Sequence, residues 1–187
     1  MTAQVGVTEG VELPHRVADP RPDAARALAE LWIAVTEAGG AVDFVPGWDP
    51  EEIRDLAVAT VDEVRTGGAR MLVLGDDTDP VGTVFVVPGT GIAAHRADVQ
   101  RLMVHPGAQG RGIGTTLLEA AVAEARDMGV EMVTLGARGG TPLPGFYAAR
   151  GFVEYGRLPG GVRLSPDDAR DVHLFHRVLR PSPGWAG

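Results

Sequence analysis

The stretch that decides the fold class runs Asp98-Val99-Gln100-Arg101-Leu102-Met103-Val104-His105-Pro106-Gly107-Ala108-Gln109-Gly110-Arg111-Gly112-Ile113-Gly114-Thr115. Up to His105 it is rich in apolar and β-branched residues and holds no Gly or Pro, which predicts a strand. Its second half spaces glycines at 110, 112 and 114 and then opens a helical run. Such a turn can direct successive backbone N–H groups at an anion beside a helix N-terminus, and a Cβ there would hinder close approach. The stretch therefore predicts a cradle for pyrophosphate.

This cradle does not match the two common nucleotide-binding motifs. The dinucleotide fingerprint needs Gly-x-Gly-x-x-Gly after the first strand of a βαβ unit. Here the turn follows the fourth predicted strand and reads Gln-x-x-Gly-x-Gly from Gln109 to Gly114. A Walker A loop ends in Gly-Lys-Ser/Thr, which the sequence lacks. The sequence indicates a different phosphate-bearing ligand.

Composition narrows the class of protein. The chain has 187 residues, a formal net charge of −8 and a pI near 5.0, which argues against nucleic acid as a partner. The absence of cysteine excludes disulfides, thiolate zinc sites and a cysteine nucleophile. His173 and His176 lie three apart in a predicted strand, so they point to opposite faces and do not indicate a metal site. Without an apolar run of about 18 residues or a signal-peptide pattern, we expect a cytoplasmic protein with no membrane partner.

The order of predicted elements indicates a single α/β domain over residues 11–180, with flexible tails at 1–10 and 181–187. Strands are expected at residues 11–18, 69–74, 81–87, 98–104, 130–135, 152–155 and 172–179. Helices are expected at residues 22–38, 49–67, 112–128 and 144–150. The second helix has the clearest start, since Asp49-Pro50-Glu51-Glu52 combines a capping residue, an early proline and first-turn acids. The strand–helix–strand unit from residue 98 to residue 135 should form a right-handed parallel crossover.

Two motifs together resemble the GNAT acetyltransferase superfamily. Gln109-x-x-Gly112-x-Gly114 follows Leu102-Met103-Val104-His105-Pro106, and Phe146-Tyr147-x-x-x-Gly151-Phe152 comes some thirty residues later. The resemblance covers residues 98–155. It implies a three-layer acyl-CoA N-acyltransferase fold, with a mixed sheet of six to seven strands flanked by about four helices.

The resemblance also implies acetyl-CoA as the cofactor. The strand backbone would bind the pantetheine arm, the turn would bind the pyrophosphate, and the strands at 98–104 and 130–135 would splay apart to leave a slot. The implied cofactor-binding residues are Leu102, Met103, Val104, Gln109, Gly110, Arg111, Gly112, Ile113, Gly114, Thr115 and Phe146.

Acetyl transfer to an amine is helped by a general base and a general acid. Asp98 is the candidate base, because it lies four residues before Leu102 and simple alternation places both side chains on one face. The alternative is a surface carboxylate. Tyr147 is the candidate acid, since its phenol is neutral near pH 7 and can donate a proton. The alternative is a half-buried tyrosine whose hydroxyl caps a backbone group.

Further side chains have two interpretations each. In GNAT folds the segment holding Trp32 and Phe44 walls the acceptor site, which makes both candidate substrate-binding residues; a core position is the alternative for Trp32. His105 is read more readily as a turn histidine than as a base. Arg111 and Arg150 could contact phosphate or be solvated charges at helix ends.

A closer resemblance points to the tabtoxin-resistance branch of these enzymes, which acetylates the amine of a small β-lactam amino acid. It is carried by Glu30-Leu31-Trp32, Gly39-Gly40-Ala41-Val42-Asp43-Phe44, the stretch at 98–104 and Leu158-Pro159-Gly160. One position departs: Gly136 stands where that branch has an acidic residue at the end of the fifth strand.

The leading hypothesis is an acetyl-CoA-dependent N-acetyltransferase acting directly on a small-molecule amine, such as a toxin or antibiotic. One alternative is acetylation of protein or peptide amines. Another is a catalytically silent acyl-CoA-binding sensor, against which the presence of both Asp98 and Tyr147 argues. Homodimers through the last strands are a family expectation.

Overall fold

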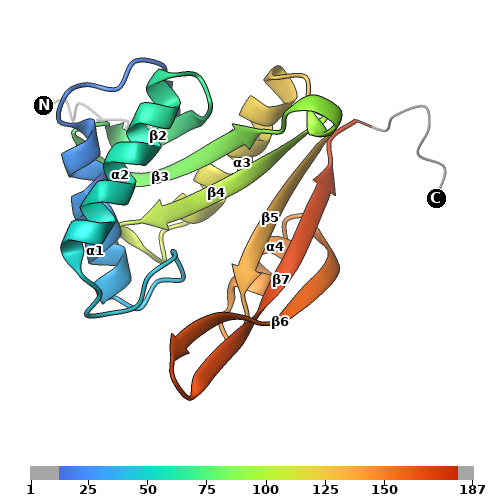
Figure 1. Cartoon of the computed structure of the whole chain (residues 1–187). Helices are drawn as coiled ribbons and strands as arrows, with labels where there is room; N and C mark the ends of the chain where they lie inside the picture. The colour runs from blue at the N-terminus through green and yellow to red at the C-terminus, as the bar shows by residue number, and fades with distance from the viewer. Residues whose placement is uncertain (1–12, 181–187) are drawn as a thin grey trace, which may run out of the picture.

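A computed structural model describes residues 13–180, in which a seven-stranded mixed sheet lies between helices (Figure 1). The predicted flexible tails and the first two residues of the strand expected at 11–18 lie outside the described residues. The strand order in the sheet is β1-β2-β3-β4-β5-β7-β6. The strands are β1 (His15–Val17), β2 (Arg70–Asp76), β3 (Asp79–Pro88), β4 (Arg96–Val104), β5 (Met132–Arg138), β6 (Val153–Ser165) and β7 (Asp168–Val178).

The four helices are α1 (Ala24–Glu37), α2 (Pro50–Arg65), α3 (Ile113–Asp127) and α4 (Leu143–Ala148), with short 3-10 turns at Gly91–Ala93 and Pro106–Ala108. The predicted fold class is confirmed. The start of α2 is also confirmed, because the Asp49 carboxylate accepts a hydrogen bond from the Glu51 N–H at 3.0 Å. Among the described residues, no helix is long and apolar enough to cross a membrane.

Two apolar cores lie on opposite faces of the sheet. One joins the sheet to α1 and α2 and includes Trp32, Phe85 and Met103. The other joins it to α3 and α4 and includes Leu117 and Tyr147. The helices therefore form outer layers on both faces, and the sheet between them carries the site.

The central strands β4 and β5 separate along their length. They pair in parallel only from Arg96–Met132 to Asp98–Thr134. Beyond these residues β4 stays paired with β3 as far as Val104, while β5 stays paired with β7 as far as Arg138. Figure 1 shows the two strands diverging below their shared end. The slot implied by the family resemblance is confirmed.

A bulge in β4 changes which residues face the slot. Arg101 has a φ of +49°, and the pairing with β3 shifts between Thr83 and Phe85. Val99 and Leu102 consequently pack against the same core, on the α3 face, although they lie three residues apart. Asp98 is on the opposite face from Leu102. The prediction that these two side chains face the same way is wrong, because alternation does not continue through a bulge.

The C-terminal hairpin is much longer than predicted. The strands predicted at 152–155 and 172–179 extend toward each other as β6 and β7, which meet at a turn after Ser165. β6 is exposed along most of its length, and its pairing with β7 shifts register in three places. One-sided burial normally produces the alternating pattern that reveals a strand. An exposed and irregular edge strand lacks that pattern.

Candidate active site

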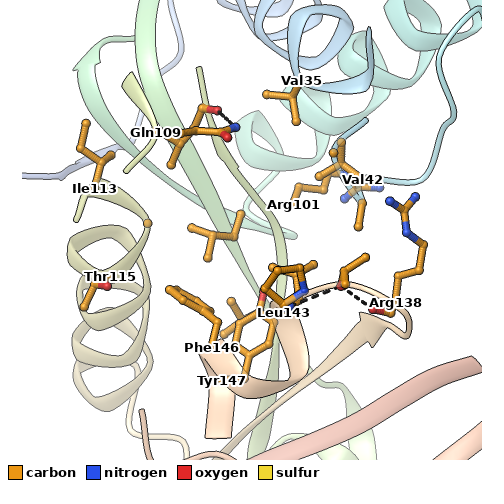
Figure 2. A pocket seen from close by; sticks show the side chains of 18 of the residues that line it. Val35, Val42, Arg101, Gln109, Ile113, Thr115, Arg138, Leu143, Phe146 and Tyr147 are labelled. Carbon is orange, nitrogen blue, oxygen red and sulfur yellow. Dashed lines mark hydrogen bonds between the residues drawn. The ribbon is translucent and has the colours of Figure 1, made fainter. Parts of the chain in front are cut away.

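The slot between β4 and β5 opens into one cavity of about 1010 Å³. At one end lies the turn at 109–115, and at the other lie the loop at 38–43 and Arg138. Phe146 and Tyr147 line the space between these ends (Figure 2). The elements therefore bring the predicted phosphate cradle and the predicted acid to one cavity.

The cradle presents a run of unpaired donors. Within the described part of the chain, none of the backbone N–H groups at positions 110–114 has an acceptor. Gly110 and Gly112 have φ values of +75° and +82°, which only glycine adopts readily. A Cβ at either position would have no protein atom within 4 Å, so the space in front of them is open. Consecutive free N–H groups at the start of α3 form a site that suits an anion.

Gln109 and Gly114 complete this turn in different ways. The Gln109 side-chain amide donates to the Val104 carbonyl at 3.1 Å and so ties the turn to the end of β4. Gly114 lies inside α3 without a positive φ, and a Cβ there would make ordinary contacts of 3.9 Å with Phe146 and Val104. Ile113 lines the cavity beside it, whereas Arg111 is exposed and is not a lining residue.

Arg150 connects the cradle to the helix that carries Tyr147. Its Nε and Nη2 donate to the Thr115 hydroxyl at 3.0 and 2.6 Å, and its Nη1 donates to the Phe146 carbonyl at 2.7 Å. The guanidinium also lies over the Phe146 ring, 3.8 Å from the ring centroid. The solvated-charge interpretation of Arg150 is wrong, because the side chain holds α4 against the first turn of α3.

Tyr147 is almost enclosed by other aromatic rings. Its side chain is 7% exposed, and the rings of Phe146, Phe152 and Phe175 lie 5.1 to 6.0 Å from it between centroids. Burial raises the pKa of the phenol to about 12. Its hydroxyl makes no hydrogen bond to residues 13–180, so the alternative of a backbone-capping tyrosine does not apply. Tyr147 is thus a protonated phenol at the wall of the cavity.

Asp98 lies at the closed end of the slot. Its carboxylate accepts a hydrogen bond from the Thr134 hydroxyl, and it does not line the cavity. The lining residue nearest to it in sequence is Val99, and Gln100 also lines the cavity. The base role of Asp98 remains a prediction, without direct contact between its carboxylate and the cavity.

Trp32 and Phe44 do not line the cavity. Trp32 is fully buried, its indole N–H donates to the Val42 carbonyl at 2.8 Å, and Phe44 packs edge-on against it at 5.7 Å. Their predicted wall position needs correction. The rings support the loop at 38–43 from behind, and that loop itself forms the wall.

Two further predictions concern residues outside the cavity lining. The Met103 side chain is buried in the core under α1 and α2, which leaves only its backbone for a ligand in the slot. His105 accepts a hydrogen bond from the Gly107 N–H at 3.2 Å, in keeping with a turn histidine.

Sequence reasoning missed three charged residues that line the acceptor end. Arg101 lies on the β4 bulge, Asp43 on the loop after α1, and Arg138 at the end of β5. Arg101 Nε lies 3.8 Å from an Asp43 oxygen, and Arg138 Nη2 donates to the Gly39 carbonyl at 3.1 Å. The signal available for Arg101 was an arginine directly before the apolar residues at 102–104 of the predicted strand. The other two come from distant segments and meet it only in the folded chain.

Comparison with known proteins agrees with this architecture. A family model described as the acetyltransferase (GNAT) family matches residues 27–152. Ribosomal-protein-alanine N-acetyltransferase from Brucella melitensis superposes with a TM-score of 0.71 at 22% identity, covering 89% of this chain and 99% of that one. N-acetyltransferase from Staphylococcus aureus Mu50 gives 0.73 at 15% identity, with 89% and 99% covered.

A third structure was solved with a ligand. Aminoglycoside 6'-N-acetyltransferase complexed with coenzyme A gives a TM-score of 0.68 at 18% identity, covering 91% of this chain and 99% of that one. At these identities the structures show only a shared fold. The family model matches more than half of the sequence and therefore shows which family the chain belongs to. The chain belongs to the acetyltransferase (GNAT) family.

Proposed function

We propose that the protein transfers an acetyl group from acetyl-CoA to the primary amine of a small molecule, with both substrates bound together. The observation that carries this proposal is the single cavity, which joins five unpaired N–H groups to Tyr147 and then to a charged end. Acetyl-CoA and the amine can therefore bind and react within the same cavity.

The residues present fit coenzyme A at the donor end. The free N–H groups at 110–114 suit its pyrophosphate. Within residues 13–180, the edge of β4 beyond Asp98 has no partner strand on the side of β5. Leu102 and Val104 would offer backbone groups along that edge to the pantetheine arm. Ile113 and Phe146 supply apolar contact beside it. When bound, the coenzyme supplies an activated acetyl thioester.

In the proposed reaction the new C–N bond forms as the C–S bond breaks. The attacking amine must first lose a proton, and Asp98 is the predicted acceptor of that proton through an intervening water. Tyr147 holds its proton at the phenol oxygen and would give it to the departing sulfur. Burial among aromatic rings keeps the Tyr147 phenol protonated, so its proton is available to the departing sulfur.

Features of the acceptor end support a small molecule over a protein. The hydrogen bond from Arg138 to the Gly39 carbonyl links β5 to the loop after α1 across this end of the cavity. Gly40 supports the loop, since a Cβ there would come within 2.5 Å of Val35. An extended peptide would have to displace the Arg138–Gly39 link.

A detoxifying role is the finer part of the proposal. It rests on the resemblance to the tabtoxin-resistance branch. Gly136, the departing position, lines the cavity, and a Cβ there would lie 3.2 Å from Val172 of β7. An acidic side chain at this position would therefore need the Val172 side chain to shift by a few tenths of an ångström. Proton removal in this protein would depend on groups other than the one used in that branch.

The direct test is thiol release from acetyl-CoA with a panel of amines, alongside calorimetric titration of CoA. The panel should hold amino acids, aminoglycosides, polyamines and peptides with free N-termini. Turnover of a small amine, with mass-spectrometric detection of its acetyl amide, is the expected result. Preference for peptides would favour the protein-acetylating alternative. Tight CoA binding with no turnover of any amine would favour the sensor.

The cradle makes a separate prediction through Gly112→Ala. We expect Kd for CoA to rise at least about tenfold, equivalent to about 1.4 kcal/mol, because the new Cβ enters the open space in front of the N–H groups. The left-handed φ of +82° should also lower the free energy of unfolding by about 1 kcal/mol. Calorimetry and urea unfolding measure the two effects.

Gly129→Ala is the matched control for this variant. Gly129 ends α3, has a φ of +80° and has open space around its Cβ position, but it does not line the cavity. Its replacement should cost similar stability and leave CoA binding unchanged. Equal binding losses in the two variants would show that general strain, and not the cradle, controls affinity.

A further inference from the structure

The lining of the cavity is cationic although the protein is acidic. The chain has a net charge of −8, yet the charged residues that line the cavity are Arg101, Arg138, Arg150 and a single acid, Asp43. Arg150 is engaged by Thr115 and the Phe146 carbonyl at the donor end. The other two arginines lie at the acceptor end, where a local excess of positive charge would attract an anionic group.

Arg101 has donor capacity that the protein leaves unused. Its side chain is 18% exposed and its guanidinium lies over the Trp32 ring, 5.3 Å from the centroid. Nη1 donates to the Gln100 side-chain carbonyl at 3.0 Å, but Nε is buried and has no hydrogen-bond acceptor among residues 13–180. A buried donor without an acceptor is costly, and a ligand that drew the guanidinium into the cavity would remove that cost.

The Asp43 carboxylate lies near Arg101 but does not accept a hydrogen bond from its Nε. The distance of 3.8 Å from Arg101 Nε to the Asp43 carboxylate is an ion-pair separation, too long for a hydrogen bond. The Asp43 side chain is 56% exposed, so its oxygens can bind a second cation. Within the described residues, Asp43 and Arg101 are also the only two non-glycine residues with positive φ, at +69° and +49°. Such strained positions concentrate at functional sites.

Arg138 approaches the same loop from β5. It donates to the Gly39 carbonyl with one nitrogen, which leaves further N–H groups of its fork for a ligand. Burial lowers the pKa of its guanidinium, and the nearby Arg170 lowers it further, while Asp168 opposes the change. Figure 2 shows Arg101 and Arg138 on the side of the cavity away from Ile113 and Thr115. An anion bound here would stabilise both charges.

We propose that the acceptor carries a carboxylate close to its amine, as an α-amino acid does. Arg101 and Arg138 bind the carboxylate, and Asp43 binds the ammonium group before it loses its proton. This assignment rests on the proposed acetyl transfer. It gives a reason for two cations and one anion to converge on the acceptor end, because a zwitterion presents the complementary charges.

The test compares each L-amino acid with its own carboxamide in the thiol-release assay. The two compounds share the side chain and the α-amine, and only the carboxylate is missing from the amide. We expect kcat/KM to be at least about tenfold higher for the acid of the preferred pair, as loss of a charged hydrogen bond implies.

Two arginine variants test the residues. Arg101→Gln and Arg138→Gln should each raise KM for the acid about 10- to 100-fold while changing KM for the amide little. Arg54→Gln is the matched control, because Arg54 is an exposed arginine of α2 paired with Glu51 outside the cavity. Thermal unfolding checks that the variants fold, and Arg101→Lys, which keeps the charge, provides a milder change at the buried position.

A binding measurement separates this inference from the proposed function. With CoA present, calorimetry should detect N-acetyl amino acids and not their N-acetyl carboxamides. Selective binding without turnover would support the carboxylate site while the acetyl-transfer proposal fails. Equal or better use of the amides would overturn the carboxylate site and leave acetyl transfer intact. If no carboxylate compound binds or reacts, the inference is also overturned.

Discussion

Replacing Tyr147 with phenylalanine should lower kcat about 100-fold, the lower end of what a general acid contributes. The phenylalanine keeps the ring packed against Phe146, Phe152 and Phe175, so the fold and the cavity wall persist. Only the proton donor is lost, which leaves the sulfur to depart as a thiolate. Steady-state thiol release measures kcat, and calorimetry should give an unchanged Kd for CoA.

The other tyrosine of the chain provides the control. Tyr155 lies on β6, is largely exposed and does not line the cavity, so Tyr155→Phe should leave kcat unchanged. A parallel loss of kcat and CoA affinity in Tyr147→Phe would indicate a binding role and would contradict the assignment as an acid.

The pH dependence should agree with this role. Burial raises the pKa of Tyr147 from its ordinary value of 10.0 to about 12, so the folded protein keeps the phenol protonated well beyond neutral pH. Between about pH 7 and pH 10 the wild-type kcat should therefore show no decline caused by this group. A descending limb near pH 10 that disappears in Tyr147→Phe would show that the phenol ionises earlier than its burial implies.

Replacing Trp32 with alanine should lower the free energy of unfolding by about 3–5 kcal/mol. Trp32 is fully buried between α1 and the sheet, and its removal would leave a cavity. It would also free the Val42 carbonyl and remove the ring beneath Arg101. Urea unfolding measures the stability, and KM for the acceptor should rise because the loop at 38–43 loses its support.

Two further variants separate packing from contact with substrate. Trp32→Phe keeps most of the volume and loses the indole hydrogen bond, so we expect a cost of about 1 kcal/mol. Trp48 is exposed and bonds to Glu52, and Trp48→Ala should change stability by less than about 1 kcal/mol. A large rise in KM for Trp32→Ala without any loss of stability would restore the original substrate-wall interpretation.

The local elements could be read from the sequence because their signals are local. The Asp49 cap and Pro50 define the start of α2, and the glycines at 110 and 112 adopt the positive φ values that a cradle needs. Similarly, the spacing from the cradle to Phe146 and Tyr147 identified the family. In each case the physical requirement falls on residues close together in the chain.

The bulge at Arg101 could not be predicted from the sequence. Nothing in the strand pattern at 98–104 marks an extra residue, because the bulge is defined by pairing with β3. Its consequence is large: Asp98 and Leu102 face opposite sides, and Arg101 turns toward the cavity. The full length of the β6–β7 hairpin was not predicted for a related reason, since β6 is stabilised by pairing with β7 more than by a buried face.

By itself, the sequence determined the family and the order of the elements, and it supplied the turn at 109–115 as the candidate phosphate site and Tyr147 as the candidate acid. These depend on backbone preferences and spacings that act within a few residues. Only the tertiary structure decided which charges share the acceptor end, since Asp43, Arg101 and Arg138 come from three separate elements. Their proximity follows from the divergence of β4 and β5 and from the path of the loop after α1. The acceptor therefore has to be inferred from contacts between distant segments, whereas the donor can be inferred from a motif.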